Sequence, residues 1–234
     1  MKVVIVGGVA GGATAAARLR RLDEQAEIVM IERTGYVSYA NCGLPYYVGD
    51  IITDKRKLTL QSPESFRNRF NIDVRVRQEA VKIDREAKTV LIRNLEDGLE
   101  YKESYDSLIL SPGAKAVKPD LPGIDDRRIL TLRTVEDTFA MKQRTDELIE
   151  QGRARAVVIG GGFIGIEAAE NLVERGFHVT LLQRGNHVMP TLDYDMACEV
   201  HAYACEHGLD LRLNQDVNGF VADEEADELT VTTA

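Results

Sequence analysis

Short apolar runs alternate along the chain with longer segments in which apolar residues recur at helical spacing. The first run, residues 2–6, leads into a glycine-rich turn at residues 7–12 and an alanine- and arginine-rich segment at residues 13–22. A second apolar run, residues 26–31, ends in Glu32. This order predicts a strand, a glycine turn, a helix and a second strand with an acidic residue at its end.

The same order begins again with the apolar run 156–159. Gly160-Gly161-Gly162-Phe163-Ile164-Gly165 follows, then a helix to about residue 175, Gly176 and a strand at residues 178–182. All three glycines of the dinucleotide fingerprint are in register here, whereas Val9 occupies the middle position of the first motif. Such glycines let the backbone approach a pyrophosphate at a helix N-terminus. Two units predict two nucleotide sites, with a glycine turn that binds nothing as the alternative.

The remaining segments complete an α/β pattern. Ser62 and Pro63 begin a short helix to residue 70, and strands are expected at residues 73–77, 81–84, 89–93 and 107–110, the last of them buried and parallel. Residues 115–129 are the candidate linker, Thr134 caps a helix to residue 151, and a helix at 193–207 and a strand at 209–213 follow. Hairpin arms at residues 217–222 and 229–233 flank an acidic turn, for which a solvated tip is expected.

Charge and cysteine content exclude several classes of protein. The net charge of −9 argues against nucleic acid and anionic membranes, which attract positive surfaces. No apolar run approaches the roughly 20 residues of a membrane helix, and three unevenly spaced cysteines make no disulfide framework, so a cytoplasmic protein is the default expectation. Cys198, His201 and Cys205 share a helix face, but three ligands from one helix make a poor metal site, and we expect none.

Cys42 lies in the loop Ser38-Tyr39-Ala40-Asn41-Cys42-Gly43-Leu44-Pro45, where a helix is expected to begin. A cysteine reacts as its thiolate, and the N-terminus of a helix favours the anion. A lone cysteine is more commonly a small buried apolar residue. Two nucleotide units around Cys42 favour a redox role instead.

The strand ends differ between the two units. Glu32 is placed to accept a hydrogen bond from a ribose hydroxyl, whereas Gln183 and Arg184 end the corresponding strand of the second unit. A guanidinium there would suit a 2′-phosphate, which favours NADPH over NADH without excluding an exposed arginine that has no ligand.

These motifs, in this order, resemble the single-cysteine flavoprotein disulfide reductases, a group of pyridine nucleotide-disulfide oxidoreductases. The resemblance is greatest to the coenzyme A-disulfide reductases and the rhodanese-fused NADH-dependent persulfide reductases. It implies an enzyme of α/β fold with two Rossmann-like units, each a three-layer unit with a parallel sheet and a β-meander, the second unit incomplete. The implied domains are an FAD-binding domain at residues 1–115, a linker and connecting helix at 116–151, and part of an NAD(P)-binding domain at 152–234.

The resemblance also implies the site residues. Those implied for FAD are Gly7, Gly8, Ala10, Gly11, Gly12, Glu32, Arg33, Ala80, Val81, Ser111, Gly113 and Ala114. Those implied for NADH or NADPH are Gly160, Gly162, Phe163, Ile164, Gly165 and Glu167, and the strand-end residues Gln183 and Arg184 add to them. Cys42 would be the catalytic nucleophile, and coenzyme A, as the substrate, would be bound by Thr14, Arg18, Arg21, Ser38, Asn41 and Arg69 or Arg67. Without the resemblance, a solvated helix face explains Arg18, Arg20 and Arg21 equally well.

Departures from the family pattern bear on the reaction. Tyr39 replaces the usual phenylalanine, and Ala10 stands where related peroxidases and water-forming NADH oxidases carry a histidine. No second cysteine lies four or five residues from Cys42, which excludes a dithiol mechanism. The chain is expected to lack the dimerisation domain through which full-length members form homodimers. Reduction of a CoA disulfide or persulfide is the leading hypothesis, and a Cys-sulfenic acid oxidase or peroxidase and an inactive nucleotide-binding fragment are the alternatives.

Overall fold

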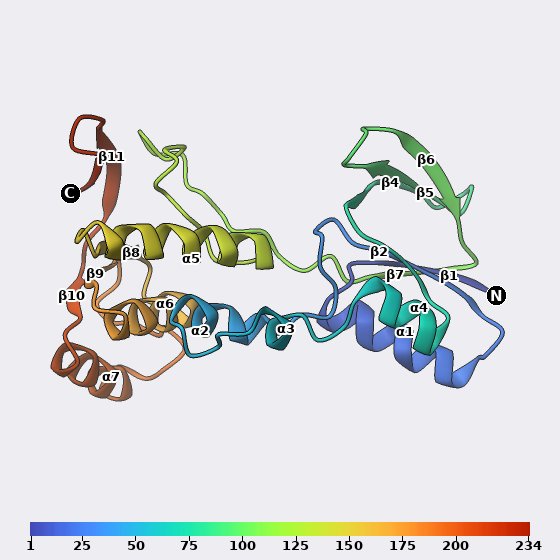
Figure 1. Cartoon of the computed structure of the whole chain (residues 1–234), viewed down its shortest axis with the longest axis horizontal. Helices are drawn as coiled ribbons and strands as arrows, with labels where there is room; N and C mark the ends of the chain where they lie inside the picture. Colours follow the sequence, from blue (N-terminus) through green and yellow to red (C-terminus); the bar gives the residue numbers. More distant parts are fainter. The chain divides into compact units, whose positions relative to one another are not determined.

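The structure is a computed structural model that describes all residues from 1 to 234, and the chain divides into two compact units (Figure 1). The first unit comprises Met1–Asn41 and Asp54–Lys115. The second unit comprises Cys42–Thr53 and Ala116–Ala234. Cys42 therefore begins a segment that belongs to the second unit, although the residues before Cys42 and after Thr53 belong to the first.

The first unit is built on a four-stranded parallel sheet in the order β3-β2-β1-β7. The strands are β1 (Lys2–Val6), β2 (Glu27–Ile31), β3 (Asp73–Arg75) and β7 (Ser107–Leu110). Alternate residues face opposite sides of a strand, and both sides of β1 and β2 are apolar, as in a sheet that is covered on both faces. Val3, Ile5, Ile28 and Met30 pack on one face with helices α1 (Ala10–Leu22) and α4 (Pro63–Phe70).

The other face of this sheet is covered by an antiparallel meander of β4 (Gln78–Asp84), β5 (Thr89–Asn94) and β6 (Glu100–Ser104). Val4, Val29 and Ile31 of the sheet form one apolar cluster with Val90 and Ile92 of β5. Helices, parallel sheet and meander make three layers, so the predicted fold class is confirmed.

The second unit contains a parallel sheet in the order β10-β9-β8 and a separate hairpin, β11-β12. The strands are β8 (Arg155–Ile159), β9 (His178–Gln183), β10 (Asp210–Leu213), β11 (Val217–Asp223) and β12 (Glu228–Thr233). The longer helices are α5 (Val135–Glu150), α6 (Phe163–Glu174) and α7 (Tyr194–Glu206). The 3-10 turn η1 (Asn41–Gly43) leads into the short helix α2 (Leu44–Val48), which packs against α5 and α6, and α3 (Lys55–Leu58) belongs to the first unit.

Local signals placed several helix ends correctly. The Ser62 side chain accepts a hydrogen bond from Ser65 N at 3.1 Å, and Pro63 opens α4. Thr134 and Asp137 form a reciprocal capping box at the start of α5. None of the helices combines the length and the apolar character that a membrane crossing requires.

Three expectations need correction. Helix α1 begins at Ala10, three residues earlier than expected, so part of the first glycine motif is helical. Strand β7 is parallel but forms the edge of its sheet, and Leu110 is 58% exposed rather than buried. The sequence also failed to predict β6, because its residues Glu100–Ser104 are almost all polar.

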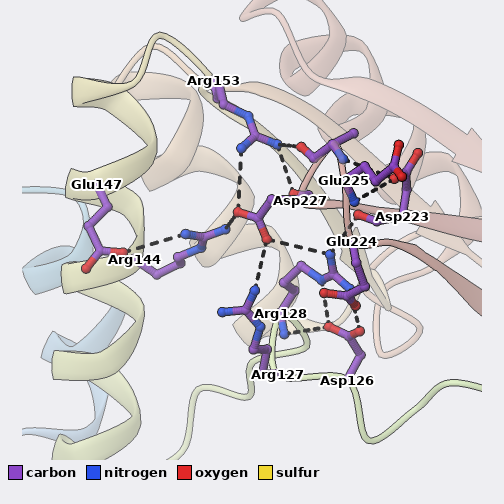
Figure 2. Close-up of polar contacts among 11 residues, drawn as sticks. Asp126, Arg127, Arg128, Arg144, Glu147, Arg153, Asp223, Glu224, Glu225 and Asp227 are labelled. Atoms are coloured by element: carbon purple, nitrogen blue, oxygen red, sulfur yellow. Dashed lines mark hydrogen bonds and ion pairs between the residues drawn. The ribbon is translucent and has the colours of Figure 1, made fainter.

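The acidic tip of the β11-β12 hairpin is not simply solvated (Figure 2). Asp227 lies within ion-pair distance of Arg127, Arg128, Arg144 and Arg153, at 3.2, 3.6, 3.0 and 3.5 Å. The hydrogen bond from Arg144, with the nearby arginine charges, lowers the pKa of Asp227 below its usual value. The hairpin is thereby tied to α5 and to the irregular segment that carries Arg127 and Arg128.

Candidate functional site

The first glycine turn has no room for a side chain at its first and last glycines, Gly7 and Gly12. Gly7 has a φ of +97°, and a Cβ at this position would lie 1.9 Å from the carbonyl oxygen of Ser111. A Cβ at Gly12 would lie 1.8 Å from the carbonyl oxygen of Gly7. Glycine therefore allows β1, the start of α1 and the end of β7 to meet at the carboxyl edge of the sheet, where α/β proteins bind ligands.

Glu32 anchors this turn from the end of β2. Its side chain is buried, and Oε2 accepts a hydrogen bond from Gly8 N at 2.8 Å. Oε1 accepts from Thr34 N at 2.8 Å and from Thr34 Oγ1 at 2.9 Å. A carboxylate offers about four acceptor positions, so three bonds leave one for another donor. The contact with a ribose stays a prediction, and the anchoring of the turn is a role that the sequence did not suggest.

The second glycine turn repeats the geometry of the first. Gly160 has a φ of +101°, and a Cβ at Gly165 would lie 1.9 Å from the carbonyl oxygen of Gly160. The Gly161 N–H donates to Gln183 Oε1 at 2.9 Å, as Gly8 donates to Glu32 in the first unit. Gln183 thus takes the structural place of the acid, with a neutral amide.

A further repeat links each turn to the loop that follows the second strand. Ser38 N donates to the Gly8 carbonyl at 2.9 Å, and Met189 N donates to the Gly161 carbonyl at 2.6 Å. Ser38 and Met189 both adopt a positive φ, at 47° and 50°. Their side chains have nothing in common, so only the structure reveals that the two positions correspond.

Packing does not explain every glycine of the second turn. A Cβ at Gly162 would meet no atom within 4 Å, and the next two residues, Phe163 and Ile164, are 58% and 54% exposed. Close approach of a pyrophosphate to the backbone is a physical reason for glycine at such a position. The residues present therefore fit a dinucleotide at this turn.

The remaining residues predicted for FAD all belong to the first unit. Arg33 is exposed, 3.9 Å from Glu79, and Ala80 and Val81 lie in β4. Ser111 donates its N–H to the carbonyl of Val6 at 2.7 Å, directly beside the glycine turn. Gly113, with a φ of +70°, and Ala114 continue this loop. The contact of these residues with FAD stays a prediction.

Cys42 occupies the middle of η1, and its side chain is exposed. The expected first turn of a helix is a 3-10 turn here, and α2 begins two residues later with buried Leu44 and Pro45. Tyr47 of α2 packs against Phe139 of α5, with the ring centroids 5.5 Å apart. The thiol thus faces solvent directly before a short helix that is largely buried.

Some of the residues predicted to bind coenzyme A lie together on one helix. Thr14, Arg18 and Arg21 are all exposed on one face of α1, because positions separated by three or four residues share a helix face. Ser38 and Asn41 are partly buried, and Arg69 is exposed on α4. All of these residues belong to the first unit.

Arg20 has a different role from its neighbours. Its guanidinium donates to the carbonyl oxygens of Phe70 at 2.7 Å, Asn71 at 2.8 Å and Glu24 at 2.7 Å. Arg20 therefore joins the C-terminal ends of α1 and α4, and a solvated helix face does not describe it.

The three residues considered for a metal are not arranged as ligands. His201 Nε2 accepts a hydrogen bond from Val188 N at 3.1 Å, and burial together with His187 lowers the pKa of His201. Cys198 is partly buried and Cys205 is exposed. No group of three or more His, Cys, Asp or Glu side chains in the chain is placed to hold a metal ion.

Two parallel-sheet units, each with a strand, a glycine turn and a helix, define an α/β protein of the dinucleotide-binding class. A family model described as pyridine nucleotide-disulphide oxidoreductase matches residues 1–234, and the chain belongs to this family.

Comparison with known proteins identifies similar members. A coenzyme A disulfide reductase of Staphylococcus aureus (strain Newman) is 37% identical over 224 residues, which is 95% of this chain and 50% of that protein. The solved structure of reduced Bacillus anthracis CoADR-RHD is 48% identical with a TM-score of 0.90, and it matches 100% of this chain over 42% of its own. A NAD-dependent persulfide reductase from A. fulgidus is 36% identical with a TM-score of 0.92, over 100% and 42% of the two chains. The chain thus spans about half the length of the curated relatives it matches.

Proposed function

We propose that this chain is the nucleotide-binding and cysteine-bearing part of an FAD-dependent reductase that uses NADH or NADPH to reduce CoA disulfide or CoA persulfide. The observation that carries the proposal is one exposed cysteine, Cys42, in a chain with two glycine turns of matching geometry. The similarity to a coenzyme A disulfide reductase and to a persulfide reductase supports the choice of substrate.

The residues present suit a thiol exchange at Cys42. Its thiolate attacks one sulfur of the disulfide, the bond between the two sulfurs breaks, and one CoA leaves as a thiolate. The other CoA stays joined to Cys42 as a mixed disulfide, whose cleavage consumes two electrons. FAD, when bound at the first turn, would relay these electrons from NAD(P)H. Arg18 and Arg21 would bind phosphates of CoA through charge-assisted hydrogen bonds.

Ala10 favours a thiol substrate over peroxide. It is the first residue of α1 and lies within the glycine turn. Alanine provides no proton donor or acceptor at the position where the related peroxidases and oxidases place a histidine. The sulfenic acid route is therefore the weaker candidate.

The test uses the longer protein that contains this chain, purified with FAD. Its visible spectrum is recorded, it is reduced anaerobically with NADH or NADPH, and CoA disulfide, CoA persulfide and hydrogen peroxide are then offered separately. We expect oxidation of the bound flavin by a CoA substrate and little by peroxide. Turnover of peroxide without turnover of either CoA substrate would contradict the proposal, and the absence of any bound flavin would favour a nucleotide-binding protein without this activity. We also propose a homodimer for the longer protein, which light scattering would test.

A further inference from the structure

The segment that begins with Cys42 is held at its far end by an arginine. Arg175, the C-cap residue of α6, has a side chain that is only 9% exposed. Its Nη1 donates to the carbonyl oxygen of Val48 at 3.2 Å, and its Nε lies 3.0 Å from Asp50 Oδ2. The last carbonyls of a helix have no partner within the helix. Arg175 thus completes the C-terminal end of α2 and pairs with the residue that follows it.

Helix α5 completes this arrangement. Lys142 lies 2.9 Å from Asp50 and 2.6 Å from Asp146. Arg175 also contacts Asp146, and it donates to Thr145 Oγ1 at 2.6 Å. Two cations and two carboxylates from three parts of the chain therefore meet around Asp50. We call Asp50, Lys142, Asp146 and Arg175 the Asp50 cluster.

The backbone at Asp50 indicates why an aspartate stands there. Gly49 is the C-cap of α2, and Asp50 has a φ of 63°, a conformation at helix ends that glycine adopts most easily. Aspartate tolerates this conformation less well than glycine. Its ion pairs with Lys142 and Arg175 favour aspartate at this position in spite of the unfavourable backbone conformation.

The packing beneath the Asp50 cluster leaves little freedom. A Cβ at Gly49 would lie 2.0 Å from Asn171 Oδ1, and Asn171 of α6 is fully buried. Its Nδ2 donates to the carbonyl of Glu167, one turn earlier in α6, at 2.7 Å. The position of α2 is therefore fixed against a helix that begins at the second glycine turn and ends at Arg175 (Figure 1).

We propose that Arg175 and Asp50 are positioning residues for Cys42, because they fix the segment that carries the thiol to the helix of the second dinucleotide turn. Neither residue needs to touch substrate or cofactor for this role. The proposal rests on the proposed function in one respect, that Cys42 is the reacting thiol, and it deepens that function by naming what holds the thiol in place.

The first test measures the thiols of the purified chain and needs no turnover. Iodoacetamide is added under native conditions, and the alkylation rates of Cys42 and Cys205 are obtained from the same sample by peptide mass spectrometry. Cys205 is exposed on α7 and serves as the internal reference. In R175Q and D50N we expect the ratio of the Cys42 rate to the Cys205 rate to change by about threefold or more, because release of the segment alters the surroundings of a thiol that is already exposed.

The double variant and a control sharpen this result. D50N/R175Q should show no larger change in this ratio than the stronger single variant, since the effects of residues that act through one contact are not additive. R212Q, which removes an exposed pair between Arg212 and Asp210 in the same unit, should leave the ratio unchanged. An unchanged ratio in R175Q, or an equal rise of both rates that signals general unfolding, would overturn the proposal.

The second test separates the positioning role from the proposed function. In the FAD-loaded longer protein, R175Q should lower kcat for CoA disulfide while the reduction of ferricyanide by NAD(P)H, which does not require Cys42, keeps its rate. Equal loss of both activities would overturn positioning. If the wild-type protein reduces ferricyanide but no CoA substrate, the proposed function fails, whereas the thiol ratio still decides whether Arg175 and Asp50 hold the Cys42 segment.

Discussion

At the scale of single residues, matching positions in the two units make the same hydrogen bond with chemically different side chains. Glu32 and Gln183 both accept a hydrogen bond from the backbone N–H of the second residue of a glycine turn, Gly8 or Gly161. The sequence predicts a difference in ribose binding for this pair, because an acidic residue at the end of this strand accepts a hydrogen bond from the ribose in dinucleotide-binding folds. The contact with the turn could not be predicted, since it depends on how the loop folds back. The motif itself predicted where the turns lie, and the side-chain partners needed the structure.

The cysteine can be tested by one substitution. C42S should leave FAD binding intact and lower the rate of CoA disulfide reduction by about 10³-fold or more, because the hydroxyl is a far weaker nucleophile than a thiolate. Steady-state rates and the flavin spectrum of the longer protein provide the measurement. C205S, at an exposed cysteine of α7, is the matched control and should keep full activity. Residual activity in C42S near the wild-type rate would exclude Cys42 as the nucleophile.

Replacement of Gly12 by any larger residue is expected to destabilise the first unit for a steric reason. In G12A the added Cβ would lie 1.8 Å from the Gly7 carbonyl oxygen, so the backbone must shift at a cost of about 2–3 kcal/mol in the free energy of unfolding. The neighbouring G11A places a Cβ 3.0 Å from the Ser111 hydroxyl oxygen and should cost much less. Urea unfolding of the two variants measures the difference. Equal effects would show that packing does not decide the glycine at position 12.

Arg184 is the residue on which the choice of nicotinamide cofactor is expected to depend. Both polar atoms of Gln183 are engaged, Oε1 with Gly161 N and Nε2 with the His187 carbonyl at 3.1 Å, whereas Arg184 is exposed. If Arg184 binds a 2′-phosphate, R184A should raise KM for NADPH by about tenfold or more and leave KM for NADH nearly constant. R212A provides a control at another exposed arginine. An equal change for both cofactors would contradict a role in selectivity.

At the scale of elements, hydrophobic pattern predicted the buried strands and missed the polar one. Strands β1 and β2 are apolar on both faces, which identified them at once. Strand β6 has no such pattern, because its buried position is occupied by Glu103 rather than by an apolar residue. Pairing with β5 and ion pairs with Lys2 and Arg75 hold it in place. A strand that is held by ion pairs has no alternation of apolar and polar residues from which it could be predicted.

Glu103 should make the first unit sensitive to acid. Burial opposes its ionisation, but hydrogen bonds from Lys2 and Arg75 outweigh burial and lower the pKa of Glu103 below the ordinary value of 4.5. A carboxyl with a lowered pKa stabilises the fold above its unfolded pKa, and this contribution is lost as the pH falls through the folded value. E103Q should therefore be less stable than wild type at pH 7 by about 1–3 kcal/mol, and the difference should shrink below pH 4.5.

Chemical denaturation across this pH range measures the effect, and the same strand supplies the control. Glu100 of β6 pairs with Arg93 at 2.7 Å, and both side chains are exposed. E100Q should cost no more than about 0.5 kcal/mol, as is usual for an exposed pair. If E103Q and E100Q behave alike at pH 7, the buried pairs do not stabilise β6.

At the scale of the whole molecule, the two glycine motifs predicted two units of one kind, and the fold confirms the class. Segment Cys42–Thr53 was not expected in the second unit, because sequence order places it beside the first. Contacts between residues far apart in the chain decide this membership. Arg175 and Asp50 are separated by more than a hundred positions, and no local period connects them. The acidic hairpin tip was misjudged for the same reason, since its arginine partners lie far away in the sequence.

Because each unit has its own glycine turn, we expect two ligands, each of which protects the amides of a different turn from hydrogen exchange. A ligand stabilises the state that it binds, by about 2.7 kcal/mol at a free concentration 100 times its Kd. Amide exchange is slowed in the residues whose local opening disrupts the binding site. FAD should therefore slow amide exchange around Gly7–Gly12 and Glu32, and NADP⁺ should slow it around Gly160–Gly165 and Gln183. Hydrogen exchange with mass spectrometry, with each ligand alone, tests this assignment. Because the carboxyl group of Glu32 and the amide of Gln183 occupy the same structural position, the two ligands should not exchange places. Protection of the same turn by both ligands would show that the repeat in structure does not correspond to a division of function.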